Sequence, residues 1–187
     1  MPILDTLIRE GKTKLIGASN WTVARINEAN AFARANGMAE FSVSQIFHNA
    51  AFINKEGVYD PTLVAMDPTE HEGYKVNGLP VMAYTSQAQG LFSHIRDKGY
   101  EGLSDGMVRT YLNPATKERA ERILAVASET GISPTAVSLA YLLHAASVKV
   151  YPILGISHVE RLTEAMGVFS LEPRHLAMLF PPDCDRG

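Results

Sequence analysis

Short apolar runs alternate with amphipathic segments along the chain. The runs predict four buried strands, at Lys14–Ala18, Phe41–Ile46, Leu79–Tyr84 and Val148–Ile153. Apolar positions at helical spacing predict helices at 22–36, 68–76, 114–130, 134–146 and 173–179, and the end of a helix at 4–10. Repeated strand and helix pairs are typical of a parallel sheet, so the sequence predicts an α/β fold. Four such units are half of an eight-stranded barrel.

Several helix boundaries are marked by residues that satisfy free backbone groups. Asn113 and Ser133 each stand before a proline and predict N-caps, while Gly131 predicts the end of the helix between them. Ser157 and Glu160 have the spacing of a capping box, which predicts a helix start there. The segment 89–106 is rich in glycine and is expected to be a loop.

The strands are continuous apolar runs, which predicts that other structure covers both faces of the sheet. A length of 187 residues, 46% of them hydrophobic, fits a single domain over 1–187. This domain is expected to be truncated, because the chain begins on a helix end, as if in mid-barrel. Leu15 and Val150 would then lie on edge strands, so we expect a homodimer or a complementing N-terminal half.

Charge and cysteine content narrow the class of protein. The formal net charge is −3, with acidic and basic residues interspersed, so neither nucleic acid nor a membrane is expected as a partner. No apolar run is long enough to cross a bilayer, and the single cysteine, Cys184, allows no intrachain disulfide. We therefore expect a cytoplasmic protein. His71 and His144 have no partner at ligand spacing, so no metal is expected.

The stretch from Ile8 to Trp21, with Arg9-Glu10-Gly11-Lys12 and Ile16-Gly17-Ala18-Ser19-Asn20-Trp21, is very similar to the fifth-strand segment of aldo-keto reductases. Agreement continues in order along the chain. Residues 42–45 resemble the sixth strand, 82–86 with Gly90-Leu91 the seventh, and 152–157 the eighth. The resemblance implies the last four βα units of a (β/α)8 barrel that binds NADP(H) and transfers hydride to or from a small carbonyl substrate.

In parallel barrels, ligands bind beyond the carboxyl ends of the strands, where polar residues of this chain fall. The resemblance implies that Ser19, Asn20 and Gln45 bind the nicotinamide carboxamide and that Tyr84 stacks on its ring. It also implies a set of residues around the phosphates and adenosine: Thr85, Ser86, Gly90, Leu91, Gly155, Ser157, Arg161 and Glu164. Trp21 and His48 are expected to line the substrate pocket.

Two alternatives stay open on the residues alone. Ser19 and Asn20 also fit a turn and cap before the helix at Thr22, and Arg161 also fits a solvated helix arginine. In the resemblance, Arg161 favours NADPH because it faces the 2′-phosphate. Glu164 belongs to a Glu-Asn pattern of the family, and here Ala165 replaces the asparagine that would contact the adenine.

The resemblance places the family's proton-donating tyrosine, with its lysine, aspartate and histidine, in the first four units, and no residue here aligns with them. Tyr59 and Lys55 have suitable types but fall in what reads as a mobile surface loop. We therefore expect an incomplete NADP-dependent aldo-keto reductase, inactive as an isolated chain. The alternatives are a non-catalytic nucleotide-binding or interaction module and a fragmentary gene product.

Overall fold

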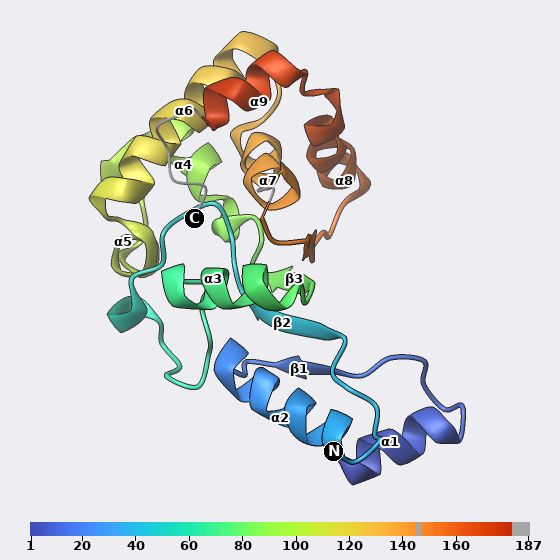
Figure 1. Cartoon of the computed structure of the whole chain (residues 1–187). Coiled ribbons are helices and arrows are strands. Elements are labelled where there is room, and N and C mark those ends of the chain that lie inside the picture. The colour runs from blue at the N-terminus through green and yellow to red at the C-terminus, as the bar shows by residue number, and fades with distance from the viewer. Residues whose placement is uncertain (145–146, 181–187) are drawn as a thin grey trace.

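The computed structural model describes residues 1–144 and 147–180, and its centre is a parallel sheet (Figure 1). The strands are β1 (Gly17–Ser19), β2 (Val43–Phe47), β3 (Val81–Tyr84) and β4 (Val150–Pro152), in the order β1-β2-β3-β4. All neighbouring strands are parallel. The predicted α/β class is confirmed, and each strand overlaps its predicted run. β1 and β4 are the edges, as the positions of Leu15 and Val150 predicted.

Helices follow the strands in the predicted alternation. They are α1 (Pro2–Arg9), α2 (Val23–Ala35), α3 (Pro68–Asn77), α4 (Leu91–Lys98), α5 (Asp105–Tyr111), α6 (Pro114–Thr130), α7 (Pro134–His144), α8 (Val159–Met166) and α9 (Pro173–Leu179). Figure 1 shows α2 and α3 beside β1 and β2, while α4, α6, α7 and α9 gather at the other end of the fold. The last two residues predicted for α7, and Cys184, lie outside the described residues.

The prediction of a loop over 89–106 was wrong, because α4 and the start of α5 lie there. α4 is short and is flanked by Gly90 and Gly99. The glycine content of the segment favoured a loop in the prediction. Its helical spacing is nevertheless visible, since Leu91, Phe92 and Ile95 are buried on one face.

Two of the predicted N-caps form. Asn113 Oδ1 accepts the Thr116 N–H at 2.8 Å, and Ser133 Oγ accepts the Ala136 N–H at 3.1 Å. The predicted capping box at Ser157 and Glu160 does not form. α8 begins one residue later, with His158 as a cap residue whose side chain makes no capping hydrogen bond. The spacing signal failed because the turn before α8 places Ser157 outside the helix start.

The sheet is covered on one face only, so the prediction of cover on both faces was wrong. Side chains alternate between faces along a strand, and those on the helix side are buried: Ala18, Ser44, Ile46, Val81, Ala83 and Val150. Of the residues on the other side, Phe47 at the end of β2 is buried beside Tyr84, and the rest are exposed or partly exposed: Gly17, Ser19, Val43, Gln45, Met82, Tyr84 and Tyr151. We call this second set the open face. In a closed barrel the open face would line the interior, which explains why the strands are apolar on both faces although helices cover only one.

Contacts between α2 and α3 fix the turn that follows β1. Glu70, on α3, is buried, and its Oε2 accepts the N–H of Val23 at 2.8 Å in the first turn of α2. Burial raises the pKa of Glu70, and the hydrogen bond from Val23 opposes this. Tyr74 Oη and Ser44 Oγ, 2.7 Å apart, tie the same helix to β2. The start of α2 is therefore held by α3 as well as by its own cap, Thr22.

Gly73 lets α3 approach α2 closely, and Gly73→Ala is expected to destabilise the protein. A Cβ at this position would stand 2.4 Å from Val23 Cγ1, so the helices would have to separate. Overpacking of this kind costs about 1–3 kcal/mol of unfolding free energy. Urea unfolding would measure it, with Gly106→Ala as the control.

Gly106 lies in α5, where the nearest atom to an added Cβ is Ser104 Oγ at 3.9 Å. Alanine is preferred over glycine in helices by about 0.5–1 kcal/mol, so this control should be neutral or stabilising. Equal effects of the two substitutions would show that the contact between Gly73 and Val23 does not limit the packing.

No single helix among residues 1–144 and 147–180 has the length and apolar character to cross a membrane. The pair α6 and α7 reaches that length and composition only when counted together, with a bend of 116° between them.

Candidate functional site

Polar side chains from three strands meet at the carboxyl ends of the sheet. Gln45 and Ser19 are register partners, with Ser19 Oγ 3.4 Å from Gln45 Oε1. Asn20 Nδ2 lies 3.4 Å from Ser19 Oγ, and Tyr84 Oη donates to Asn20 Oδ1 at 2.8 Å. The four residues expected to bind the nicotinamide therefore form one connected group, which we call the strand-end cluster.

The strand-end cluster is fixed from behind. Asn20 Oδ1 also accepts the N–H of Val64 at 3.2 Å, and the ring of Tyr84 stacks on that of Phe47 with centroids 5.6 Å apart. Burial raises the pKa of Tyr84, and the bond to Asn20 partly offsets this. Within the described residues, Gln45 Nε2 has no hydrogen-bond partner. Gln45 is thus the clearest free donor for an amide or carbonyl ligand.

Backbone strain is concentrated at the same edge of the sheet. Among the residues with described structure, four that are not glycine have positive φ: Asn20, Thr85, Ala88 and Gln89. One lies in the strand-end cluster and three lie in the loop after β3. Conformations of this kind cost about 1–3 kcal/mol each and gather at ligand-binding sites. The strain therefore favours the end of β1 and the loop after β3 as candidate ligand-binding segments.

Beside the strand-end cluster lies a cavity of about 730 Å³ between the loop after β3 and the start of α8. Several of the residues expected around the phosphates and adenosine line it: Thr85, Ser86, Gly90, Gly155, Arg161 and Glu164. Ser86 Oγ donates to the carbonyl of Ile153 at 2.6 Å, which ties the loop to the end of β4. The opposite wall comes from α4 and the start of α7, where Ser93 and Thr135 are hydrogen-bonded at 2.8 Å.

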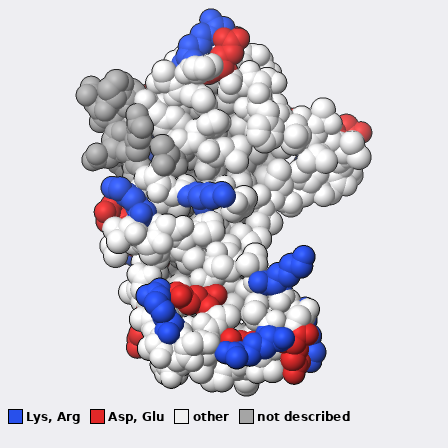
Figure 2. All heavy atoms as spheres, turned by 45° about the vertical axis from the view of Figure 1, so that its right-hand side comes forward, with Lys and Arg blue, Asp and Glu red and all other residues white. Residues whose placement is uncertain are grey.

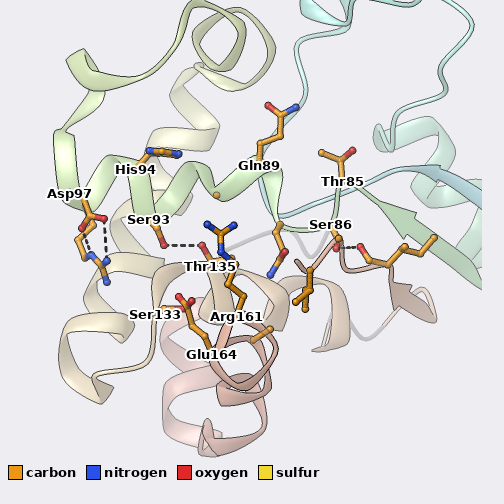
Figure 3. A pocket seen from close by; sticks show the side chains of 17 residues that line it. Thr85, Ser86, Gln89, Ser93, His94, Asp97, Ser133, Thr135, Arg161 and Glu164 are labelled. Atoms are coloured by element: carbon orange, nitrogen blue, oxygen red, sulfur yellow. Dashed lines mark hydrogen bonds and ion pairs between the residues drawn. The ribbon is translucent and has the colours of Figure 1, made fainter. Parts of the chain in front are cut away.

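Figure 3 shows Arg161 extending from α8 into this space, between Ser93 and Thr135 on one side and Gln89 on the other. In the described part of the chain its guanidinium has no hydrogen-bond or ion-pair partner. The other arginine of the cavity, Arg96, is paired with Asp97 at 2.7 Å. An anionic group entering the cavity would therefore find Arg161 available.

Charges elsewhere form small mixed groups. On the face seen in Figure 2, Lys and Arg stand near Asp and Glu or singly, and no continuous basic stripe crosses the uncharged surface between them. The cations on that face therefore do not form a wide positive patch.

Four of the predicted site residues belong neither to the cavity lining nor to the strand-end cluster. Leu91 is fully buried in the core, and Ser157 is exposed beside the start of α8. Trp21 packs edge-on against Phe41, with the Arg25 guanidinium 4.1 Å from its ring centroid.

His48, the fourth, lies next to Arg119 and His71, which belong to the helix layer. Desolvation, with the nearby positive charges of Arg119 and His71, lowers the pKa of His48 to about 3. His48 is half-buried, and these surroundings favour its neutral form; the substrate-pocket role of Trp21 and His48 stays a prediction.

Sequence reasoning missed the α4 and α7 side of the cavity. Further lining residues come from there: Ser93, His94, Arg96, Asp97, Ser133 and Thr135. Ser93, His94, Arg96 and Asp97 were missed because the segment containing α4 was expected to be a loop, whereas Ser133 and Thr135 lie at a helix start that was predicted but not assigned to the site. The apolar spacing of Leu91, Phe92 and Ile95 would have placed Ser93, His94 and Asp97 on a helix.

Comparison with known proteins agrees with this arrangement. The model of the aldo/keto reductase family matches residues 1–178. The norsolorinic acid reductase of Aspergillus flavus is 26% identical over 171 residues, which cover 90% of this chain and 40% of that protein. A putative aryl-alcohol dehydrogenase of Schizosaccharomyces pombe is 25% identical over 176 residues, covering 92% and 46%. The chain thus spans about half the length of the curated relatives it matches.

This chain also covers about half of the solved structures that it resembles. A putative 2,5-diketo-D-gluconic acid reductase B superposes with a TM-score of 0.61 and 16% identity, over 96% of this chain and 50% of that one. The aldose reductase of Schistosoma japonicum superposes with a TM-score of 0.58 and 21% identity, over 94% and 44%. These likenesses show the fold, a partial barrel. With the family model matching nearly the whole length, the chain belongs to the aldo/keto reductase family.

Proposed function

We propose that this chain is the cofactor-binding part of an NADP-dependent carbonyl reductase and that it does not catalyse reduction by itself. The observation that carries the proposal is Arg161, an arginine without a described partner, directed into a polar cavity that adjoins the strand-end cluster. The proposal includes a cytosolic location, which the single cysteine supports as typical of reducing compartments.

The residues present fit a dinucleotide. The cavity is lined by the loop after β3, by α4, by the start of α7 and by α8, and its volume of about 730 Å³ suits a ligand of that size class. Arg161 stands in the first turn of α8, where helix N–H groups also favour an anion. Gln45 and Ser19 would hold an amide at the other end. The bound dinucleotide would supply hydride, and the chain's own residues would bind and orient it.

Cofactor titration tests the proposal. NADPH is expected to bind more tightly than NADH, because a 2′-phosphate would reach the guanidinium of Arg161. A charge-assisted hydrogen bond contributes about 1.5–3 kcal/mol, so Arg161→Ala should weaken NADPH binding roughly 10- to 100-fold. The same variant should leave NADH binding nearly unchanged. Fluorescence titration or calorimetry would measure both affinities.

Arg174→Ala is the matched control. Arg174 is an exposed arginine of α9 that pairs with Glu172 at 3.0 Å and does not line the cavity. It should leave both affinities unchanged. Equal affinity of the wild type for NADPH and NADH would contradict the proposed role and would identify Arg161 as a solvated helix arginine.

A further inference from the structure

Within residues 1–144 and 147–180, three surfaces without a partner lie at or near the two ends of the sheet. The first is the free edge of β1. The N–H of Ser42 bonds to Ile16 and that of Asn20 to Gln45, so even-numbered residues pair with β2 and the backbone of Gly17 and Ser19 faces outward. The second is the free edge of β4. By the same reasoning from Ile153 and Lys149, which bond to β3, Val150 presents an N–H and a carbonyl outward, and Pro152 a carbonyl alone.

The third surface is an apolar stripe on the outside of α8 and the turn after it. It consists of Val159, Leu162, Met166 and Phe169, at the spacing of one helix face and between 46% and 74% exposed. A run of exposed apolar side chains on one helix face commonly marks an interaction site on a monomer. Ala165 and Val168, on the other side of the helix, are buried. α8 therefore has one face packed on the fold and one without a described partner.

We propose that two copies of this chain associate about a two-fold axis, with β4 of each copy beside β1 of the other. The inference is independent of the proposed cofactor. A second copy fits because the two free edges belong to different strands, β1 and β4, and these strands run in the same direction. β4 of one copy can therefore pair in parallel with β1 of the other. Four strands are half of an eight-stranded ring, so a two-fold rotation pairs both edges and leaves none free. The open face then becomes the interior, as parallel sheets require.

The helix layer supports the same pairing. α1 precedes β1 in the chain and α8 follows β4, and the two helices lie far apart in the fold (Figure 1). α1 buries none of its own residues, and Ile3 is exposed. Pairing β4 with β1 of the other copy brings the stripe of α8 toward α1 of that copy. The stripe of each copy is thus covered by α1 of the other copy, so the same contact forms twice in the dimer.

Light scattering after size exclusion tests the proposal at micromolar concentration. The wild type is expected at twice the mass of the chain. Leu162→Glu and Phe169→Glu place charges in the stripe, and Leu15→Lys places one beside the β1 edge. Each should raise the dimer dissociation constant roughly 100-fold, from the cost of burying an unpaired charge. Since all three positions are exposed, circular dichroism should show unchanged folding.

Val76→Glu is the matched control, because Val76 is an equally exposed apolar residue on α3, away from both edges. It should leave the dimer intact. A monomeric wild type, an open-ended series of larger species, or a dimer unchanged by the stripe substitutions would each overturn the proposal. So would a chain that is monomeric alone but binds one-to-one to the N-terminal half of a relative, which would assign the edges to that half.

Discussion

The purified 187-residue chain is expected to reduce no aldehyde or ketone above background when NADPH is supplied. A bound NADPH orients the hydride, but no group then donates a proton to the alkoxide that develops from the carbonyl. General acid catalysis typically raises the reaction rate by about 10²- to 10⁴-fold, and this contribution would be missing. The structure offers no evident substitute among the candidates from sequence. Lys55 is paired with Asp67 at the start of α3, and Tyr59 is exposed to solvent. Burial raises the pKa of Tyr84, which makes it a weaker acid.

Mixing with an excess of the separately expressed N-terminal half of a close relative, so that this half displaces a second copy from the sheet edges, should restore NADPH oxidation with a generic aldehyde such as 4-nitrobenzaldehyde. Asn20→Ala or Gln45→Ala in this chain should then lower the recovered rate, because both lie in the strand-end cluster. Robust turnover by the chain alone would contradict the expectation. It would direct attention to Tyr151 on the open face, whose ring centroid is 5.3 Å from Lys149 Nζ, and Tyr151→Phe would then test it.

Mild acid is expected to destabilise the protein through His48. The histidine has a pKa of about 3 in the folded state, against about 6.5 in an unfolded chain. Above pH 6.5 it is neutral in both states and costs nothing. Below pH 6.5 the unfolded chain binds a proton that the folded protein does not, so stability falls with pH down to about 3. The loss between pH 7.5 and pH 5 amounts to about 2 kcal/mol of unfolding free energy.

Urea unfolding of the wild type and His48→Gln at several pH values would measure this effect. Since glutamine does not titrate, the variant should lose less stability between pH 7.5 and pH 5, by about the same 2 kcal/mol. Between pH 7 and pH 8 the difference in stability between the two proteins should be constant, which provides an internal control. Parallel pH profiles over the whole range would show that His48 takes up protons freely in the folded state.

The sequence alone determined the strands, their parallel arrangement and the residues that meet at their ends. These features depend on local rules: an apolar run predicts a buried strand, and polar residues just after parallel strands converge on one edge. Ser19, Asn20, Gln45 and Tyr84 therefore come together as expected. The caps at Asn113 and Ser133 follow from rules of the same short range.

Only the tertiary structure decided how these residues are used. Burial, and not residue type, sets the low pKa of His48. Lys55 forms an ion pair with Asp67, so its amine is already paired. The wall that α4 adds to the cavity depends on a short helix whose signal is weaker than its flanking glycines. The open face could not be read from the strands either. An apolar run is the same whether its second face meets helices or a barrel interior, because both environments exclude water.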